Sequence, residues 1–283
     1  MAEMILPGVF IEVRPEGLIV PGQITVSNLG VVGTAARGPI GVPVLLGSYT
    51  EARQRFYKYD PWIDGSHNEL TLVRALEQSF RHGATTVFAV RVASSGAAKA
   101  SFPLQGAGGP PPRPCVTLKA KSPGEWGNDI SFNVKDAEED AFIEDELHPG
   151  SEATPITLKH KPVVKSARNR VSHHIDATGI TRTLKLLYDG GPAPAAGQVQ
   201  IDRTTGQLTF GDAPVAADKV TVSYAVARAN AVKVTLRLEE EAEEVYTVVD
   251  GNDLADDINR RSALVTAAPD ATHGGELPAK SVP

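Results

Sequence analysis

Residues 66–92 read SHNELTLVRALEQSFRHGATTVFAVRV, and this stretch decides the fold of the first part of the chain. Apolar residues recur three or four positions apart over residues 70–80, which predicts a helix with one apolar face. Ser66, with a glutamate three residues later, has the form of a capping box that would begin this helix. Gly83 stands where a glycine commonly ends a helix, and the β-prone run over residues 85–92 predicts a strand.

The residues before this stretch extend it to an α/β unit over residues 23–93. The runs over residues 24–34 and 42–46 are short and apolar, and we expect both to be strands. Ser48 begins a second capping box, which predicts a helix to about Tyr57. Strand, helix and strand in this order predict a crossover connection and a partly parallel sheet.

The first 22 residues have the pattern of an extended arm rather than of a compact domain. A short β-prone run over residues 6–13 contains a Pro-Gly turn, and two further turn signals follow it. An extended segment cannot satisfy its own backbone groups, so we expect it to pair with a sheet edge of its own chain or of a neighbour. The residues that we assign to this inter-subunit arm contact are Leu6, Val9, Phe10, Ile11 and Val13.

Turn residues and strand patterns dominate the middle of the chain. Residues 94–114 are small and rich in glycine and proline, with the run GGPPP over residues 108–112, which predicts a linker and a domain boundary. Residues 115–249 contain several alternating runs, and those over residues 198–226 predict an antiparallel meander. The acid-rich residues 136–146 are interpreted as a solvated loop or a weak helix.

The end of the chain predicts one helix and a flexible segment. Residues 250–267 begin with acidic residues and carry Arg260 and Arg261 later, as the helix dipole favours, and we expect this helix to return to the first α/β unit. Residues 268–283 are predicted to be a flexible tail. The predicted fold class is α+β: an α/β unit with an extended N-terminal arm, plus a β-rich inserted domain resembling a meander or sandwich.

Composition excludes several classes of partner. The formal net charge is −6 and the pI is about 5.7, whereas nucleic-acid-binding domains have a pI above ~9, so no nucleic acid is expected. No apolar run is long enough to span a membrane, so direct membrane insertion is not expected. The N-terminus carries an acid and its apolar run is broken by Pro7, which predicts cytoplasmic assembly without a signal peptide.

Cys115 is the single cysteine and is interpreted as a small apolar strand residue.

No catalytic, cofactor or metal site is predicted. The chain lacks the glycine-containing motifs of serine hydrolases, P-loops and dinucleotide-binding folds. Adjacent His173 and His174 would point to opposite faces of a strand, so they cannot easily chelate one ion, and the histidines are expected at the surface. The glutamate run over residues 239–244 is interpreted as a solvated turn or as a complement to a basic patch on a neighbour.

A glycine-rich turn surrounds one of the two tryptophans. Residues 122–129 read SPGEWGND, and Trp126 is interpreted as a plug at the edge of a core in preference to a platform that stacks a ligand. The residues assigned to this structural turn are Gly124, Trp126, Gly127 and Asn128.

Several segments together resemble the sheath proteins of contractile tails, which occur in myophages, tailocins and phage-tail-like injection systems. Residues 7–13, PGVFIEV, resemble the Pro-Gly-Val-Tyr-Ile-Glu-Glu opening of that family. Residues 31–39, VVGTAARGP, with PVLL shortly after them at residues 43–46, resemble a second segment of the family. Residues 80–92 resemble its Phe-x-x-Gly-Gly element and the strand that follows that element. Residues 120–130, AKSPGEWGNDI, resemble its Pro-Gly-x-Trp-Gly-Asn turn. A weaker likeness extends over residues 257–265.

The resemblance implies a structural subunit that polymerises helically around an inner tube and contracts. The implied partners are copies of the same chain, the inner tube protein, and baseplate or tail-terminator proteins, and no cofactor is implied. The implied location is a virion tail or a particle released by lysis. Residues 115–249 would be an insertion on the outer surface. Family members usually continue into a C-terminal domain, which we expect to be absent here.

Two other classes of function remain open. A monomeric β-rich binding module, such as a fibre or adhesin domain, would explain the strands and turns but not the arm or the α/β unit. An enzyme, most plausibly a hydrolase, would need a nucleophile motif that the sequence lacks.

Overall fold

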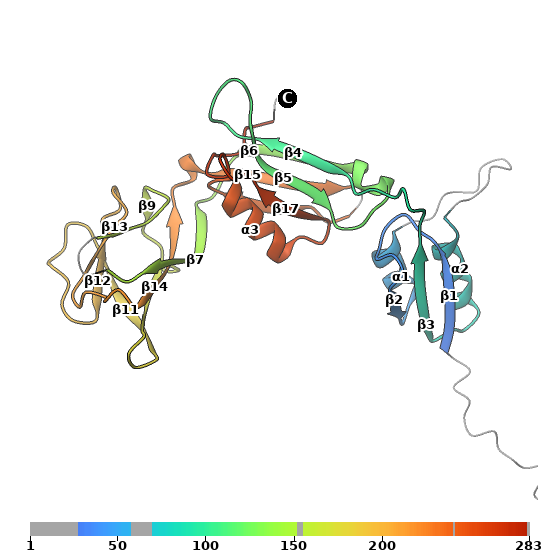
Figure 1. Cartoon of the computed structure of the whole chain (residues 1–283), viewed down its shortest axis with the longest axis horizontal. Helices are drawn as coiled ribbons and strands as arrows, with labels where there is room; N and C mark the ends of the chain where they lie inside the picture. Colours follow the sequence, from blue (N-terminus) through green and yellow to red (C-terminus); the bar gives the residue numbers. More distant parts are fainter. Residues whose placement is uncertain (1–27, 58–69, 152–154, 240, 282–283) are drawn as a thin grey trace, which may run out of the picture. The chain divides into compact units, whose positions relative to one another are not determined.

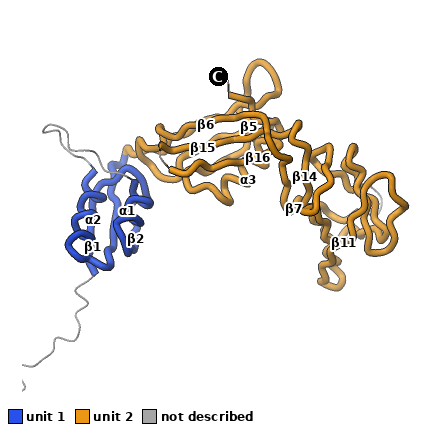
Figure 2. Tube along the Cα trace, turned by 180° about the vertical axis from the view of Figure 1, so that it is seen from behind, with its two compact units in different colours: residues 1–95 blue, residues 96–283 orange. Residues whose placement is uncertain are grey.

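A computed structural model of the chain describes residues 28–57, 70–151, 155–239 and 241–281. The chain forms two compact units, residues 1–95 and 96–283 (Figure 2). Within the described residues both units combine helices with sheets, and strands predominate, so the fold is mixed α+β.

The first unit is a three-stranded sheet with two helices. The central strand pairs in parallel with one neighbour and antiparallel with the other, which confirms the partly parallel sheet predicted from the strand–helix–strand order. The strand order is β1-β3-β2. The elements are β1 (Asn28–Thr34), β2 (Pro43–Leu46), α1 (Tyr49–Phe56), α2 (Thr71–Arg81) and β3 (Thr86–Val92).

Helix ends in this unit follow local signals. The Ser48 hydroxyl accepts a hydrogen bond from the Glu51 backbone N–H at 3.2 Å, and this caps α1 as the sequence predicts. Helix α2 begins at Thr71, and the capping box expected at Ser66 lies outside the described residues. Gly83 has a φ of 93°, which is the left-handed conformation expected of the glycine after this helix.

The core of the first unit lies on one face of the sheet, between the strands and both helices. Its buried members come from the strands, from the two helices and from the loop after β1. These members are Ala35, Leu46, Ala52, Phe56, Leu72, Val73, Leu76, Val87 and Ala89. The opposite face of the sheet contributes nothing to this core.

The second unit contains two three-stranded sheets and a helix, α3 (Figure 1). In β15, every second side chain is fully buried while the residues between are polar, as the alternating sequence predicts. One sheet has the order β17-β5-β4: β4 (Ser101–Gln105), β5 (Pro114–Ala120) and β17 (Val265–Pro269). The other has the order β16-β15-β6: β6 (Ile130–Asp136), β15 (Val232–Leu238) and β16 (Glu244–Val248).

Helix α3 (Gly251–Arg261) is shorter than the predicted 250–267 and does not return to the first unit. The Asp250 carboxylate caps it by accepting from the Asp253 N–H at 2.7 Å. It ends because the Ser262 hydroxyl accepts from the backbone N–H groups of Leu264 and Val265, at 3.1 and 3.0 Å, and turns the chain into β17. The helix packs on β17, β16 and β5, all in the second unit.

The remaining strands of the second unit form an eight-stranded sheet. The order β7-β14-β10-β11-β12-β13-β8 places β14 between β7 and β10, and β9 also pairs with β14. The strands are β7 (Ala141–Pro149), β8 (Ile156–Thr157), β9 (Val163–Val164), β10 (Arg170–Ile175), β11 (Ile180–Tyr188), β12 (Gln198–Ile201), β13 (Gln207–Phe210) and β14 (Lys219–Val226).

The predicted meander over residues 198–226 is only partly present. Strands β12 and β13 form the expected antiparallel pair, but β14 pairs with β7 and β10 instead of β13, and β11 pairs with β12 in parallel. Alternation of apolar residues determines which face of a strand is buried, and it does not specify the neighbouring strand. The acid-rich segment 136–146, predicted to be a loop or a weak helix, is a loop only over residues 137–140, because β6 ends at Asp136 and β7 begins at Ala141.

Three predicted boundaries are wrong for related reasons. The expected linker 94–114 contains β4, which pairs with β5. The expected insertion 115–249 is not one module, because β5, β6, β15 and β16 build the sheets beside α3. The expected flexible tail 268–283 is ordered to Ser281, whose N–H donates to the Val134 carbonyl at 3.0 Å. In the linker and the tail, pairing with a distant strand edge orders residues whose composition indicates a loop.

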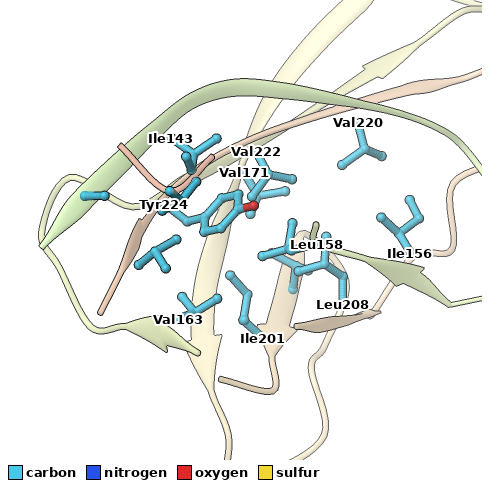
Figure 3. Packing of buried hydrophobic residues seen from close by; sticks show 14 of the residues in the cluster. Ile143, Ile156, Leu158, Val163, Val171, Ile201, Leu208, Val220, Val222 and Tyr224 are labelled. Atoms are coloured by element: carbon cyan, nitrogen blue, oxygen red, sulfur yellow. The ribbon is translucent and has the colours of Figure 1, made fainter. Parts of the chain in front are cut away.

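Tyr224 lies in the core of the eight-stranded sheet (Figure 3). The carboxylate of Glu146 is buried beside its hydroxyl. Glu146 is 6% exposed and accepts hydrogen bonds from the Tyr224 hydroxyl at 2.5 Å and the Lys159 N–H at 3.1 Å. His148 Nε2 lies 2.7 Å from the same carboxylate. Burial acts to raise the pKa of Glu146, but these hydrogen bonds outweigh it and the pKa lies below 4.5.

We expect Glu146→Gln to destabilise the chain by about 1–3 kcal/mol at pH 7, because charge-assisted hydrogen bonds are lost. A carboxylate with a lowered folded-state pKa stabilises the fold above its unfolded value near 4.5, and this contribution disappears as pH falls through the lower folded value. The difference between the variant and the original chain should therefore shrink below pH 4.5. Urea unfolding at several pH values, monitored by circular dichroism, measures this difference in free energy of unfolding.

The matched control is Glu144→Gln on the same strand, where the side chain is 42% exposed and pairs with Arg260. An exposed ion pair contributes less than about 1 kcal/mol. If the loss of unfolding free energy caused by Glu146→Gln stays constant as the pH falls below 4.5, the lowered pKa of Glu146 is contradicted.

Candidate functional site: an apolar sheet face and its supporting loop

The arm residues assigned from the sequence, Leu6, Val9, Phe10, Ile11 and Val13, lie outside the described residues. The residues of the 122–129 turn are described. The surface best suited to binding among the described residues is one that the sequence analysis did not single out, in the first unit.

The sheet of the first unit exposes an apolar outer face, on the side away from α1 and α2. Val32 is 67% exposed, Leu45 56%, Phe88 42% and Val92 41%. The strand register places Val32 and Pro43 on either side of Val90, and Leu45 beside Phe88. We define the outer face as Val32, Pro43, Leu45, Phe88, Val90 and Val92.

The outer face carries no charged side chain, although it is open to solvent. Isolated exposed apolar residues are normal, but a contiguous apolar patch marks an interaction site. Five of the seven residues of β3, all but Thr86 and Arg91, are apolar and fall on both faces of the strand, a pattern typical of strands covered on both faces. This apolar pattern was the signal in the sequence for the outer face. Helices α1 and α2 cover only one side of the sheet, so the apolar residues on its other side stay exposed.

Arg91 supports the loop at one end of this sheet. Its side chain lies on the covered side of β3 and is 3% exposed. The guanidinium donates to three carbonyl oxygens of the loop after β1: from Nε to Ala35 at 2.8 Å, from Nη1 to Gly38 at 2.7 Å, and from Nη2 to Ala36 at 3.1 Å. Burial lowers its pKa. The planar fork of five donors suits this task, because one side chain satisfies several buried acceptors.

The turn that contains Trp126 is a 3₁₀ helix (Glu125–Asp129) that packs against the sheet of β4 and β5. Trp126 is 3% exposed and its indole N–H donates to the Ser122 carbonyl at 3.2 Å. A Cβ on Gly127 would lie 2.8 Å from the Ala100 Cβ and 2.9 Å from that of Ala120. Only glycine permits this close approach, so the turn anchors the start of β4. Asn128 lies beside it and lines a small hollow.

A cleft of about 660 Å³ beside α3 is the place where catalysis would be sought. It is lined mainly by carboxylates of β7 and α3, with Lys159, His160 and Arg260. Burial, together with neighbouring carboxylates, raises the pKa of Asp253 to about 7. A carboxylate with a perturbed pKa in a cleft is a candidate catalytic acid or base. Its hydrogen-bond and ion-pair partners indicate whether it serves catalysis or structure.

These carboxylates already have structural partners. Asp250 caps α3, and an Asp253 oxygen accepts from the Val249 N–H at 3.1 Å. Asp257 pairs with Arg260 and Arg261. The cleft therefore holds the start of α3 and its ion pairs.

Three further side chains of the second unit, His173, His174 and Cys115, have polar partners within the chain. His173 is buried, against expectation, with Nε2 2.8 Å from an Asp218 oxygen, while His174 lies 2.9 Å from the Thr181 hydroxyl. Cys115 is buried in β5, where burial raises the pKa of its thiol to about 11. Across the described part of the chain, no three His, Cys, Asp or Glu side chains are placed to hold a metal ion. The helices in that part are all too short or too polar to cross a membrane.

We expect Arg91→Lys to destabilise the chain by about 2 kcal/mol or more. A lysine ammonium cannot reach all three loop carbonyls, and a buried acceptor left without its donor costs about 1–3 kcal/mol. Chemical denaturation measures the loss. The control Arg81→Lys, where the side chain is 68% exposed and paired with Glu77, should change stability little. Equal effects of the two substitutions would show that the loop does not depend on Arg91.

Comparison with known proteins gives distant structural neighbours. The sheath tail protein of Listeria innocua matches 90% of this chain with 14% identity and a TM-score of 0.41, over 32% of its own length. The sheath tail protein of Desulfitobacterium hafniense matches 90% with 12% identity and a TM-score of 0.39, over 33% of its length. The chain thus spans about a third of the length of these structures. No family model and no curated protein matches the chain. Similarity at this level carries no argument about function.

Proposed function

We propose that the chain is a structural subunit of a contractile sheath, which polymerises around an inner tube and contracts to drive the tube through a target envelope. The observation that carries the proposal is the order of the segments resembling the family along the sequence. Two of these segments also act together in the structure: Arg91, from residues 80–92, binds the carbonyls of the loop within residues 31–39.

The arm formed by residues 1–22 would connect neighbouring copies. A strand added to a neighbour's sheet is held by backbone hydrogen bonds, which tolerate a change of orientation between the two bodies. Such a connection lets subunits stay linked while their bodies move and repack. The arm residues stand in the order typical of the family, and the proposal rests on that resemblance.

The outer face of the first unit would be covered by a second copy of this chain. It carries apolar side chains and no charge, so a neighbour that packs on it leaves no charge buried without a partner. Full burial of a Val, Leu or Phe side chain contributes about 1.5–3 kcal/mol, and these residues are already half covered. The face would therefore strengthen subunit contacts that the arm establishes.

The remaining partners follow from the same proposal. They are an inner tube protein and baseplate or tail-terminator proteins, in a virion tail or in a particle released by lysis after assembly in the cytoplasm. A monomeric binding module would leave the outer face exposed to water, and a hydrolase would need side chains that the acidic cleft uses for structure. Self-association separates the sheath subunit from both alternatives.

We expect deletion of residues 1–20 to abolish assembly while the two units stay folded, because the deleted residues precede the first described strand. Negative-stain electron microscopy across a concentration series, with light scattering, measures assembly, and circular dichroism measures folding. The full chain should form tubes, rings or smaller oligomers. Assembly by the truncated chain would contradict the role of the arm. Loss of folding would show that the arm pairs within its own chain.

We expect Phe88→Asp and Val32→Asp to reduce self-association by about tenfold or more while leaving the fold intact, because a carboxylate would be buried against a neighbour. The control is Ile180→Asp in β11, at a side chain that is 48% exposed in the second unit. Sedimentation at several concentrations measures the association constants. Equal effects at all three positions would indicate a non-specific effect of charge on solubility.

A further inference from the structure

The eight-stranded sheet is attached to the rest of the second unit as an appendage, formed by residues 137–231. The chain leaves at Asp136, the last residue of β6, and returns at Val232, the first residue of β15, and these two residues are paired across the ladder. Two connections side by side act as a hinge, because they fix the point of attachment but resist rotation about it only weakly. The angle of the appendage therefore depends on contacts away from the hinge.

Two charge contacts join the appendage to α3 across the acidic cleft. The Arg260 guanidinium pairs with Glu144 of β7 at 2.7 Å, and both side chains are about half exposed. His160 Nε2 lies 3.5 Å from an oxygen of Asp250, and this contact is an ion pair only while the imidazole carries two protons. An exposed ion pair contributes less than about 1 kcal/mol, so a small change in the charge of the cleft can shift the balance between a closed and an open arrangement.

Asp253 lies where the appendage meets the start of α3. Its carboxylate accepts a hydrogen bond from the Val249 N–H at 3.1 Å. The Val249 side chain packs in the apolar core of the eight-stranded sheet, although the residue itself directly precedes α3 in the chain. Asp253 thus connects the helix to a residue that is inserted into the appendage, and a change in its charge acts at this connection.

The charged and titratable groups around Asp253 come from four elements and are mainly acidic. On β7 they are Glu144, Asp145 and Glu146, and on the loop after β8 they are Lys159 and His160. On β14 the group is the Tyr224 hydroxyl, and on α3 they are Asp250, Asp256, Asp257 and Arg260. With Asp253 ionised, seven carboxylates share the cleft with the two permanent cations Lys159 and Arg260. A proton on Asp253 removes one of these negative charges at the most enclosed position.

The position of Asp253 makes closure of the cleft depend on pH. Burial, followed by the neighbouring carboxylates, raises its pKa from 3.8 to about 7. Opening of the cleft brings water to the carboxyl and returns the pKa towards 3.8. A group with the higher pKa in the closed arrangement favours closure while it holds its proton, and this contribution is lost as the pH rises through about 7. With these two pKa values, the ratio of open to closed chains rises about tenfold between pH 6 and pH 8.

We propose that the cleft beside α3 is a proton-dependent latch: it holds the appendage against α3 while Asp253 carries a proton, and it lets the appendage pivot when that proton passes to water. The appendage keeps its fold in both arrangements, because its own strands supply most of its apolar core. Only its angle to the sheets beside α3 changes. The latch lies within a single chain, so the proposal does not depend on the sheath assignment.

Single-molecule fluorescence energy transfer in the full chain tests the proposal. Dyes are attached to Thr183→Cys, at an exposed position of β11 in the appendage, and to Lys119→Cys, at an exposed position of β5. The buried Cys115 does not compete for the dyes, and the high dilution keeps the chains single. We expect one population at pH 6 and a second one that gains about tenfold relative to the first by pH 8. An unchanged distribution between these pH values would overturn the proposal.

Two variants of α3 locate the proton. Asp253→Asn cannot ionise, while its amide oxygen can still accept from the Val249 N–H, so this variant should show only the closed population at both pH values. The matched control is Asp256→Asn, at an exposed residue of the same helix that lines the same cleft, and it should keep the pH response. A response that persists in Asp253→Asn, or that disappears equally in both variants, would refute the role of Asp253.

Circular dichroism verifies the fold of each variant. Should Asp253→Asn fail to fold, carbon-13 NMR of the Asp253 carboxyl in the unsubstituted chain replaces it. The midpoint of the carboxyl titration should then coincide with the midpoint of the change in energy transfer. A carboxyl that is already fully ionised at pH 6 would overturn the proposal.

Discussion

The first unit depends on the buried guanidinium of Arg91. The loop after β1 turns the chain from β1 towards β2, and its backbone pairs with β3 only at an isolated bridge between Ile40 and Arg91. Three of its carbonyls find donors on one side chain that comes from the central strand. The loop is therefore fixed relative to the sheet, and the apolar face beside it keeps a defined shape. The buried guanidinium of Arg91 on one side of the sheet thus supports the uncharged outer face on its other side.

The second unit relies on a different means of joining elements. Its two three-stranded sheets share α3, which packs on β17, β16 and β5. Residues 277–281 hydrogen-bond to both sheets at one end, and the Phe102–Phe132 stack bridges them at the other. Backbone pairing and ring stacking thus substitute for a continuous ladder.

Local signals in the sequence predicted local structure well. The Ser48 cap, the Gly83 helix end and the alternating β15 were all readable because each depends on residues within one turn or one strand. Pairing between distant segments was not readable: β14 lies between β7 and β10, and β4 occurs in a stretch whose glycines and prolines indicated a linker. The outer face was visible only in the apolar run of β3. The arm residues stay a prediction, because they lie outside the described residues.

The eight-stranded sheet leaves and rejoins the rest of the second unit at almost one point. The chain departs after Asp136 at the end of β6 and returns at Val232 at the start of β15, and these two residues are directly paired across the ladder. Paired residues in antiparallel strands are about 5 Å apart, which a short turn can bridge. The intervening residues are therefore topologically dispensable to the sheets that they interrupt. A change of length within this appendage would leave the pairing of Asp136 with Val232 in place, so the two sheets beside α3 tolerate variation there.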